Sequence, residues 1–177
     1  KNTKKLILCS ESNYIDLLNN KKIDKTIYNY VCAVYKTHFL MICRIELKIF
    51  NWNDILEYNL VRSTLKKKKI SDNLPNKLKI GIPDKDSDSY YDALKIFKCV
   101  GIDITKKNDN ITIVIDTEKN LFNRMKKNID SEDTIDLIFL TCPYKNHYLE
   151  DFLNTKSISV FGTEGIKDSV IKAEFKD

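Results

Sequence analysis

The chain has 177 residues, 42% of them hydrophobic, which is enough apolar material for one domain with a substantial core. Its 30 Lys and Arg residues against 25 Asp and Glu residues give a formal net charge of +5. That excess is too weak to indicate nucleic acid as a partner. No apolar run approaches the roughly 18 residues that a membrane-spanning helix requires. The composition therefore argues against nucleic-acid binding without excluding it, and it predicts no membrane-spanning segment.

The first half of the chain alternates between strand-like and helix-like hydrophobic patterns. Short runs rich in Val, Ile, Cys and Tyr predict strands at Leu6–Cys9, Tyr28–Tyr35 and His38–Ile45. A helical stretch is expected around residues 15–18, with Ser10 or Ser12 as its cap, and a short helix from Asn51 or Asn53 that presents Trp52, Ile55 and Leu56. The polar stretch 63–76 contains Lys66–Lys69 and is interpreted as a solvated loop.

The second half continues the alternation more regularly. Strands are predicted at Leu78–Ile82, Ile111–Ile115, Thr134–Leu140 and Ile158–Phe161. One helix is expected after Ser87 or Ser89 and ends at Gly101, a second follows Thr117 with Leu121, Phe122, Met125 and Ile129 on one face, and a third follows Pro143. This order predicts an α/β fold with a mostly parallel sheet flanked by helices.

The chemistry-bearing motifs point away from catalysis. The four glycines form neither a dinucleotide-binding loop nor a P-loop, and no nucleophile elbow occurs. Cys142 and His147 are close in sequence, but nothing supplies an orienting third group or an oxyanion hole. The five cysteines contain no CxxC pair and are interpreted as reduced, buried thiols rather than disulfide or zinc ligands. We therefore predict no enzyme activity, no catalytic residue, no metal and no cofactor.

The loop Pro83–Ser89 is the most informative segment, because it joins a strand to a helix N-terminus. Backbone N–H groups at such a terminus usually attract an anion. Here Asp84, Asp86 and Asp88 surround the turn and would repel one. Their alternate spacing is similar to a calcium loop, but the central Gly and the distal Glu are missing. Structural capping is therefore favoured over calcium binding.

The order of the segments resembles the type 2 periplasmic-binding-protein fold. Four stretches carry the resemblance: TIYNYVCAVYKTHFLMICRIE, FNWNDIL, KLKIGIPDKDSDSYYDALKIFKCVGID and IDLIFLTCPYKNHYLEDFLNTKSISVF. The chain is most similar to the TAXI family of TRAP-transporter solute receptors and their NMT1-like relatives, from Leu6 to Phe161. The family's first strand-helix unit has no counterpart before Leu6. Asp and Lys also replace the glycines of the first ligand loop.

The resemblance implies a single α/β domain, 1–177, or two lobes. The first lobe would be partial, with 1–48 and 155–177, and the second would be 49–154. A lost ligand loop on a retained scaffold implies a non-catalytic structural or interaction subunit, with other protein subunits as its partners. The alternative is a functioning small-solute-binding protein, with its ligand at Ser10, Ser12, Ser87, Ser89, Tyr90 and Cys142. Reduced cysteines and a bacterial-type fold in a eukaryote-like composition imply an intracellular reducing compartment, with the mitochondrion slightly favoured over the cytosol.

Overall fold

The computed structural model describes residues 17–22, 38–64, 75, 77–142, 149–150 and 157–175. The chain divides into two compact units, residues 1–36 and 37–177. In the first unit, residues 17–22 form a helical turn in which the Lys22 N–H donates to the Leu17 carbonyl at 2.8 Å. The predicted strands Leu6–Cys9 and Tyr28–Tyr35 lie outside the described residues.

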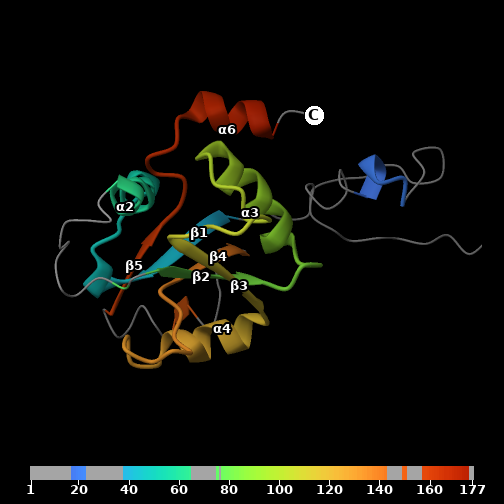
Figure 1. Cartoon of the computed structure of the whole chain (residues 1–177). Helices are drawn as coiled ribbons and strands as arrows, with labels where there is room; N and C mark the ends of the chain where they lie inside the picture. The colour runs from blue at the N-terminus through green and yellow to red at the C-terminus, as the bar shows by residue number, and fades with distance from the viewer. Residues whose placement is uncertain are drawn as a thin grey trace, which may run out of the picture. The chain divides into compact units, whose positions relative to one another are not determined.

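The second unit is built on a five-stranded sheet with the order β3-β2-β4-β1-β5 (Figure 1). Its strands are β1 (His38–Arg44), β2 (Leu78–Pro83), β3 (Ile111–Asp116), β4 (Leu137–Cys142) and β5 (Ile158–Phe161). β2 runs parallel to both β3 and β4, whereas β1 lies antiparallel between β4 and β5. The predicted α/β class is confirmed. The sheet is mixed, because two of its pairings are parallel and two are antiparallel, so a mostly parallel sheet is not confirmed.

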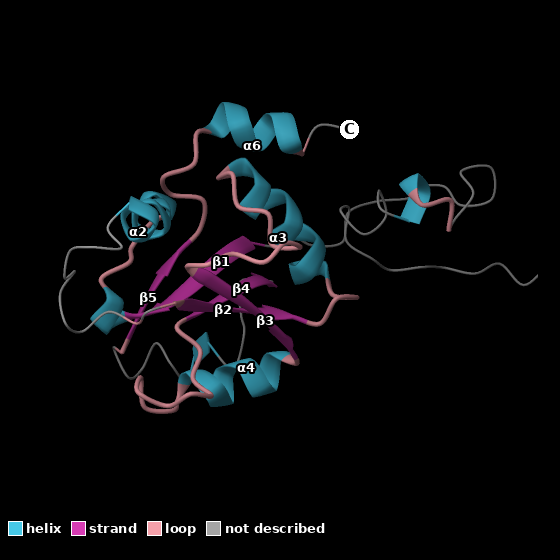
Figure 2. Cartoon of the chain, viewed as in Figure 1, coloured by secondary structure: helices cyan, strands magenta, loops and turns pink. Residues whose placement is uncertain are grey.

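Helices cover both faces of this sheet, as Figure 2 shows. On one face lie α2 (Trp52–Thr64) and α3 (Asp88–Cys99), with α6 (Asp168–Glu174) packed on α3; on the other lies α4 (Glu118–Met125). The period-2 alternation of the strands divides the core accordingly. Met41 and Phe139 pack with α2 and α3, whereas Ile42 and Ile138 pack with α4.

An aromatic cluster fixes α2 and α3 on the sheet. Trp52, the first residue of α2, is fully buried, and its ring meets Phe97 edge-on at 5.0 Å between centroids. Its indole N–H donates to the carbonyl of Gly162, 2.8 Å away, at the end of β5. One side chain therefore connects α2, α3 and the last strand, and it satisfies its own polar atom in doing so.

Local signals placed most helix ends correctly. The Ser87 hydroxyl accepts from the Tyr90 N–H and caps α3, and Gly101, with φ of +74°, follows the end of that helix. Thr117 caps α4 as predicted. The prediction that Ile129 belongs to the face of α4 is wrong, because the helix ends at Met125 and Ile129 lies in the next loop.

Two boundaries differ from the expected ones. α2 extends to Thr64, so the polar loop begins later than residue 63. β4 begins at Leu137 instead of Thr134, because the preceding residues turn to meet Arg44 and Lys79, and it continues to Cys142. Within the described ranges, no helix has the length and apolar character needed to span a bilayer.

Candidate functional site

The carboxyl ends of β2 and β4 meet at one edge of the sheet, where open α/β sheets collect ligands. We define the strand-end site as Ser87, Ser89, Tyr90, Thr141 and Cys142. The first three residues come from the start of α3 and the other two from the end of β4. Two further predicted contacts, Ser10 and Ser12, lie outside the described residues.

The two predicted serines of this site are bonded within the chain. The Ser87 hydroxyl accepts from the Tyr90 N–H at 3.2 Å as the cap of α3. Ser89 is only 6% exposed. Its hydroxyl accepts a hydrogen bond from the Thr141 N–H at 2.9 Å and donates one to the Thr141 carbonyl at 3.4 Å. Ser89 thereby ties α3 to the end of β4. Ser87 therefore acts as a helix cap, and Ser89 bonds the backbone of β4.

The acidic loop before α3 is solvated. Asp84 and Asp86 are exposed, and the Ser87 N–H closes the turn by donating to the Asp84 carbonyl at 2.8 Å. Among the described residues, no three His, Cys, Asp or Glu side chains gather in a way that could hold a metal ion. Asp84, Asp86 and Asp88 outnumber the single Lys85 of this loop and leave the surface beside the strand-end site with a net negative charge.

One buried polar atom of the strand-end site makes no hydrogen bond within the described residues. The Thr141 Oγ1 is buried and has no hydrogen-bond partner in the part of the chain that the structure describes. Beside it, Cys142 is 5% exposed, and burial, followed by the charge of Glu118, raises the pKa of its thiol. The sequence singled out Cys142 and missed Thr141, whose hydroxyl has no distinctive local pattern.

A separate pocket of about 430 Å³ lies between α3, the loop after it, and α6. Its rim carries both signs of charge, with Lys98 and Glu174 forming a 2.8 Å ion pair across the two helices. Lys95 lies 4.9 Å from the centroid of the Phe175 ring. The pocket was not predicted, because α6 follows the last strand that the hydrophobic pattern identified.

No family model, curated protein or solved structure matches this chain.

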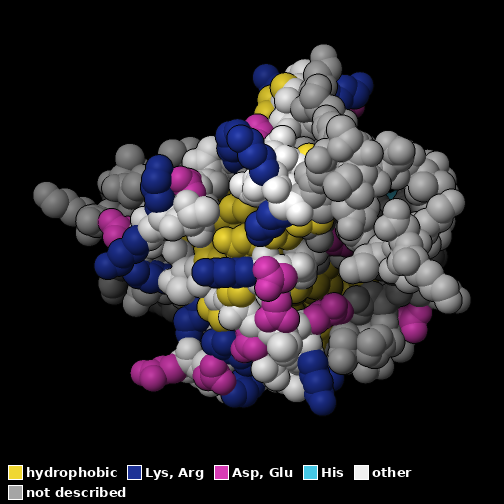
Figure 3. Space-filling model, turned by 90° about the vertical axis from the view of Figure 1, so that its right-hand side faces the viewer, with side chains coloured by type: hydrophobic (Ala, Val, Ile, Leu, Met, Phe, Trp, Pro, Cys, Tyr) yellow, Lys and Arg dark blue, Asp and Glu magenta, His cyan; other side chains and the backbone are white. Residues whose placement is uncertain are grey.

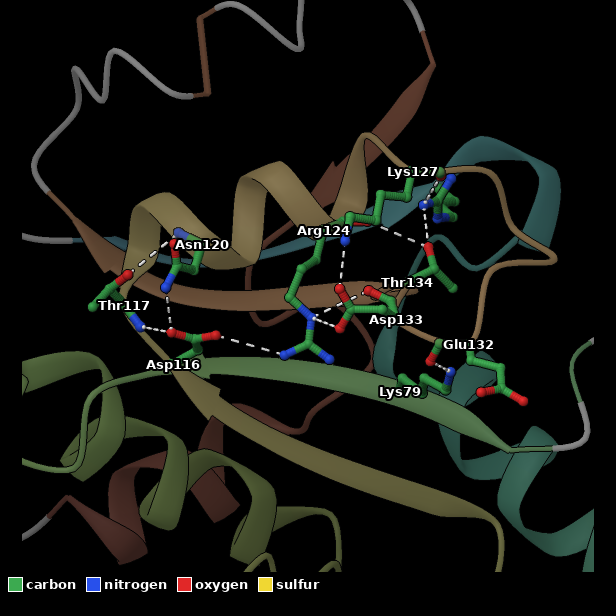
Figure 4. Close-up of polar contacts among 10 residues, drawn as sticks. Lys79, Asp116, Thr117, Asn120, Arg124, Lys127, Glu132, Asp133 and Thr134 are labelled. Atoms are coloured by element: carbon green, nitrogen blue, oxygen red, sulfur yellow. Dashed lines mark hydrogen bonds and ion pairs between the residues drawn. The ribbon is translucent and has the colours of Figure 1, made fainter.

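A polar network lies beside α4 on the other face of the sheet (Figure 4). Arg124 pairs with Asp133 at 3.0 Å and with Asp116 at 3.6 Å. Asn120 donates a hydrogen bond to Asp116 and lowers the pKa of that carboxyl. Lys127 forms an ion pair with Asp133 and lowers the pKa of the Asp133 carboxyl. Arg124 and Lys127 of this network both form ion pairs with Asp133, so they connect α4 and its C-terminal end to the loop that precedes β4.

A buried arginine lies next to this network. Arg44, at the end of β1, is 9% exposed and donates to the carbonyls of Ile135 at 2.9 Å and Lys127 at 2.7 Å. A third bond reaches the Thr134 hydroxyl at 2.6 Å. The neighbouring Asp136 is 1% exposed, and burial raises the pKa of its carboxyl. One carboxylate oxygen accepts from the Lys79 N–H at 2.8 Å, and the other has no hydrogen-bond partner among the described residues.

Burial disfavours the thiolate form of the three described cysteines. Burial is the largest cause of a raised thiol pKa at Cys43, Cys99 and Cys142, and at Cys43 the charges of Asp136 and Asp54 add to it. A thiolate is the reactive form of cysteine, and a raised pKa keeps these side chains protonated at neutral pH. The geometry at these positions supports packing more than chemistry.

Proposed function

We propose that this protein is a non-catalytic structural or interaction subunit of a larger protein assembly, built on a degenerate solute-binding-like fold. The bonding of Ser89 is the observation that carries the proposal. A ligand-binding loop needs polar groups that are directed at the ligand. Here the Ser87 and Ser89 hydroxyls are engaged by backbone N–H groups of the chain itself.

The surface supports the same proposal. In Figure 3, hydrophobic side chains of the described residues are visible at the surface among Lys, Asp and Glu. Apolar surface rimmed by charges of both signs is typical of protein–protein contact sites. The described residues also include four exposed large hydrophobic side chains, Ile45, Phe50, Ile115 and Val170.

Native mass spectrometry of the protein isolated gently from its own cells tests the proposal, because one spectrum reports protein partners and small molecules together. We expect a stoichiometric protein complex without a bound metabolite. A chain that carries only a small added mass would contradict the proposal. A matched isolation after adding high salt separates specific partners from charge-driven contaminants.

The runner-up function is small-solute binding at the strand-end site, and the unpaired Thr141 Oγ1 favours it. The negative charge of Asp84, Asp86 and Asp88 would select a cationic or amine-bearing solute. Thermal shift with an amine panel tests this function, with Thr141→Val as the variant that removes the hydroxyl at similar volume. A stabilisation that Thr141→Val abolishes would establish the runner-up; no shift with any amine would exclude this ligand class.

A further inference from the structure

β3 is an edge of the sheet. Its six residues pair with β2 on one side, and among the described residues no strand pairs with it on the other. β5, the opposite edge, has only four residues. The β3 strand is therefore the longer of the two edges and offers more backbone groups to another chain.

The hydrogen bonds to β2 fix which residues of β3 point outward. The Leu78 N–H donates to the Asn110 carbonyl at 2.9 Å, and Leu78 is in register with Ile111. In a parallel ladder this places the N–H and C=O groups of the even-numbered residues toward β2. The Ile111 N–H already donates to the Asn108 side chain at 3.1 Å. The Ile111 carbonyl and both backbone groups of Ile113 and Ile115 remain, and we call the outward groups of Ile113 and Ile115 the β3 edge.

Among the residues that the structure describes, the β3 edge lacks the devices that usually protect an exposed strand. Proteins place Lys, Pro, a bulge or a covering segment at such edges. Residues 111–115 are all Ile, Thr or Val, the register with β2 runs without a bulge, and Ile115 is 38% exposed. A strand of this composition, left open, is suited to pairing with another strand.

We propose that the β3 edge pairs antiparallel with the β3 edge of a second copy of this chain, about a two-fold axis at Val114. This inference rests on the proposed function and names a partner for it. In that register Ile113 lies opposite Ile115 of the partner subunit, and the pair exchanges both hydrogen bonds. All outward groups of the β3 edge are then satisfied, because the two-fold axis repeats the pair.

The side chains and charges fit the same register. Val114 meets Val114 of the partner subunit across the axis, and the β-branched Ile pair lies on the opposite face of the joined sheet. Asp116, the charged residue of β3, falls opposite Thr112 of the partner subunit. No like charges face each other within the paired strands, so the two-fold arrangement has no electrostatic penalty at its centre. A partner with a different edge sequence would need its own matching register.

Sedimentation velocity of the full chain tests the pairing, from about 5 to about 500 µM because a small interface is weak. We expect a reversible monomer–dimer equilibrium. Ile115→Lys places a charge on the β3 edge at an exposed position and should leave the protein monomeric throughout. Val170→Lys is the matched control, since Val170 is also 38% exposed but lies on α6; it should dimerise like the wild type. Circular dichroism checks that both variants are folded.

Amide hydrogen exchange at low and high protein concentration locates the interface. The Ile113 and Ile115 amides should become protected only at high concentration, whereas the Val114 amide, bonded to β2, should be protected at both. A wild type that stays monomeric, a dimer that survives Ile115→Lys, or protection of Ile113 and Ile115 in the monomer would overturn the pairing. A monomer that nevertheless forms a stoichiometric complex with other proteins would contradict the pairing and leave the proposed function intact. A monomer without any protein partner would contradict both the pairing and the proposed function.

Discussion

Replacing Arg44 by methionine should destabilise the protein strongly. The substitution keeps an unbranched apolar stem but removes all three side-chain hydrogen bonds of Arg44. The buried Ile135 carbonyl loses this donor, which costs about 1–3 kcal/mol. The buried Asp136 carboxyl also loses the favourable electrostatic contribution of Arg44. Together with the lost hydrogen bonds, we expect a total loss of about 3–5 kcal/mol.

Arg124→Met is the matched control. Arg124 is 21% exposed in its side chain and pairs with Asp116 and Asp133, which are more exposed. Solvent screens such pairs, so we expect a loss of about 1 kcal/mol or less. Urea unfolding followed by circular dichroism measures both variants, and an unchanged denaturant slope shows that the unfolding reaction is the same.

Two other outcomes of the Arg44→Met and Arg124→Met measurements are informative. If Arg44→Met and Arg124→Met lose equal stability, the burial of Arg44 has no energetic consequence and the reasoning is refuted. If Arg44→Met does not fold, the double variant with Asp136→Asn should recover part of the loss, because it removes the unpaired buried carboxylate.

Three other substitutions test the packing of the core and the raised pKa of Asp136. Trp52→Ala should cost about 3–5 kcal/mol in urea unfolding, since Trp52 is fully buried, whereas Phe50→Ala, at a side chain 51% exposed, should stay near zero; equal losses would contradict the packing described here. Gly81→Ala would place a Cβ 2.8 Å from a methyl group of Leu121, and we expect a loss of about 1–3 kcal/mol from overpacking, detected as a lower melting temperature; an unchanged melting temperature would mean that Leu121 moves freely. Burial raises the pKa of Asp136 above its ordinary value of 3.8 in the folded state, so protonation of this carboxyl stabilises the fold at low pH. That stabilisation is lost as the pH rises from 3.8 through the raised pKa. Asp136→Asn should therefore reduce the decline in unfolding free energy across this range, and a steeper decline would refute the assignment.

The helix and strand positions were largely predictable, because they depend on local patterns. Ser87 and Thr117 cap their helices, and the strand Ile158–Phe161 begins and ends where the pattern placed it. The antiparallel placement of β1 was not predictable, since alternation of strands and helices does not fix the direction of a strand whose neighbours are distant in sequence. Ile129 was wrongly assigned to α4 because it lies four residues after Met125, which is a helical spacing, although the helix ends at Met125.

The candidate site was predictable in its position and not in its role. A helix N-terminus beside a strand end was visible in the sequence, and so were its acidic side chains. That Ser89 bonds the backbone of β4 depends on a contact 52 residues away in the chain. The buried Arg44 was also missed, because a single arginine at the end of a strand usually reaches solvent. Only the tertiary structure identifies the carbonyl groups that it meets.

The position of β1 has a consequence for how the protein is made. It precedes the other strands of the sheet in the described part of the chain, yet its partners β4 and β5 follow it by roughly 100 residues. A ribosome that has released β1 must synthesise most of the remaining chain before either edge of that strand can pair. Such a topology favours slow, late closure of the sheet, and it leaves an apolar strand exposed during synthesis. In the cell, the protein should therefore depend on chaperones most strongly in the interval before β5 emerges.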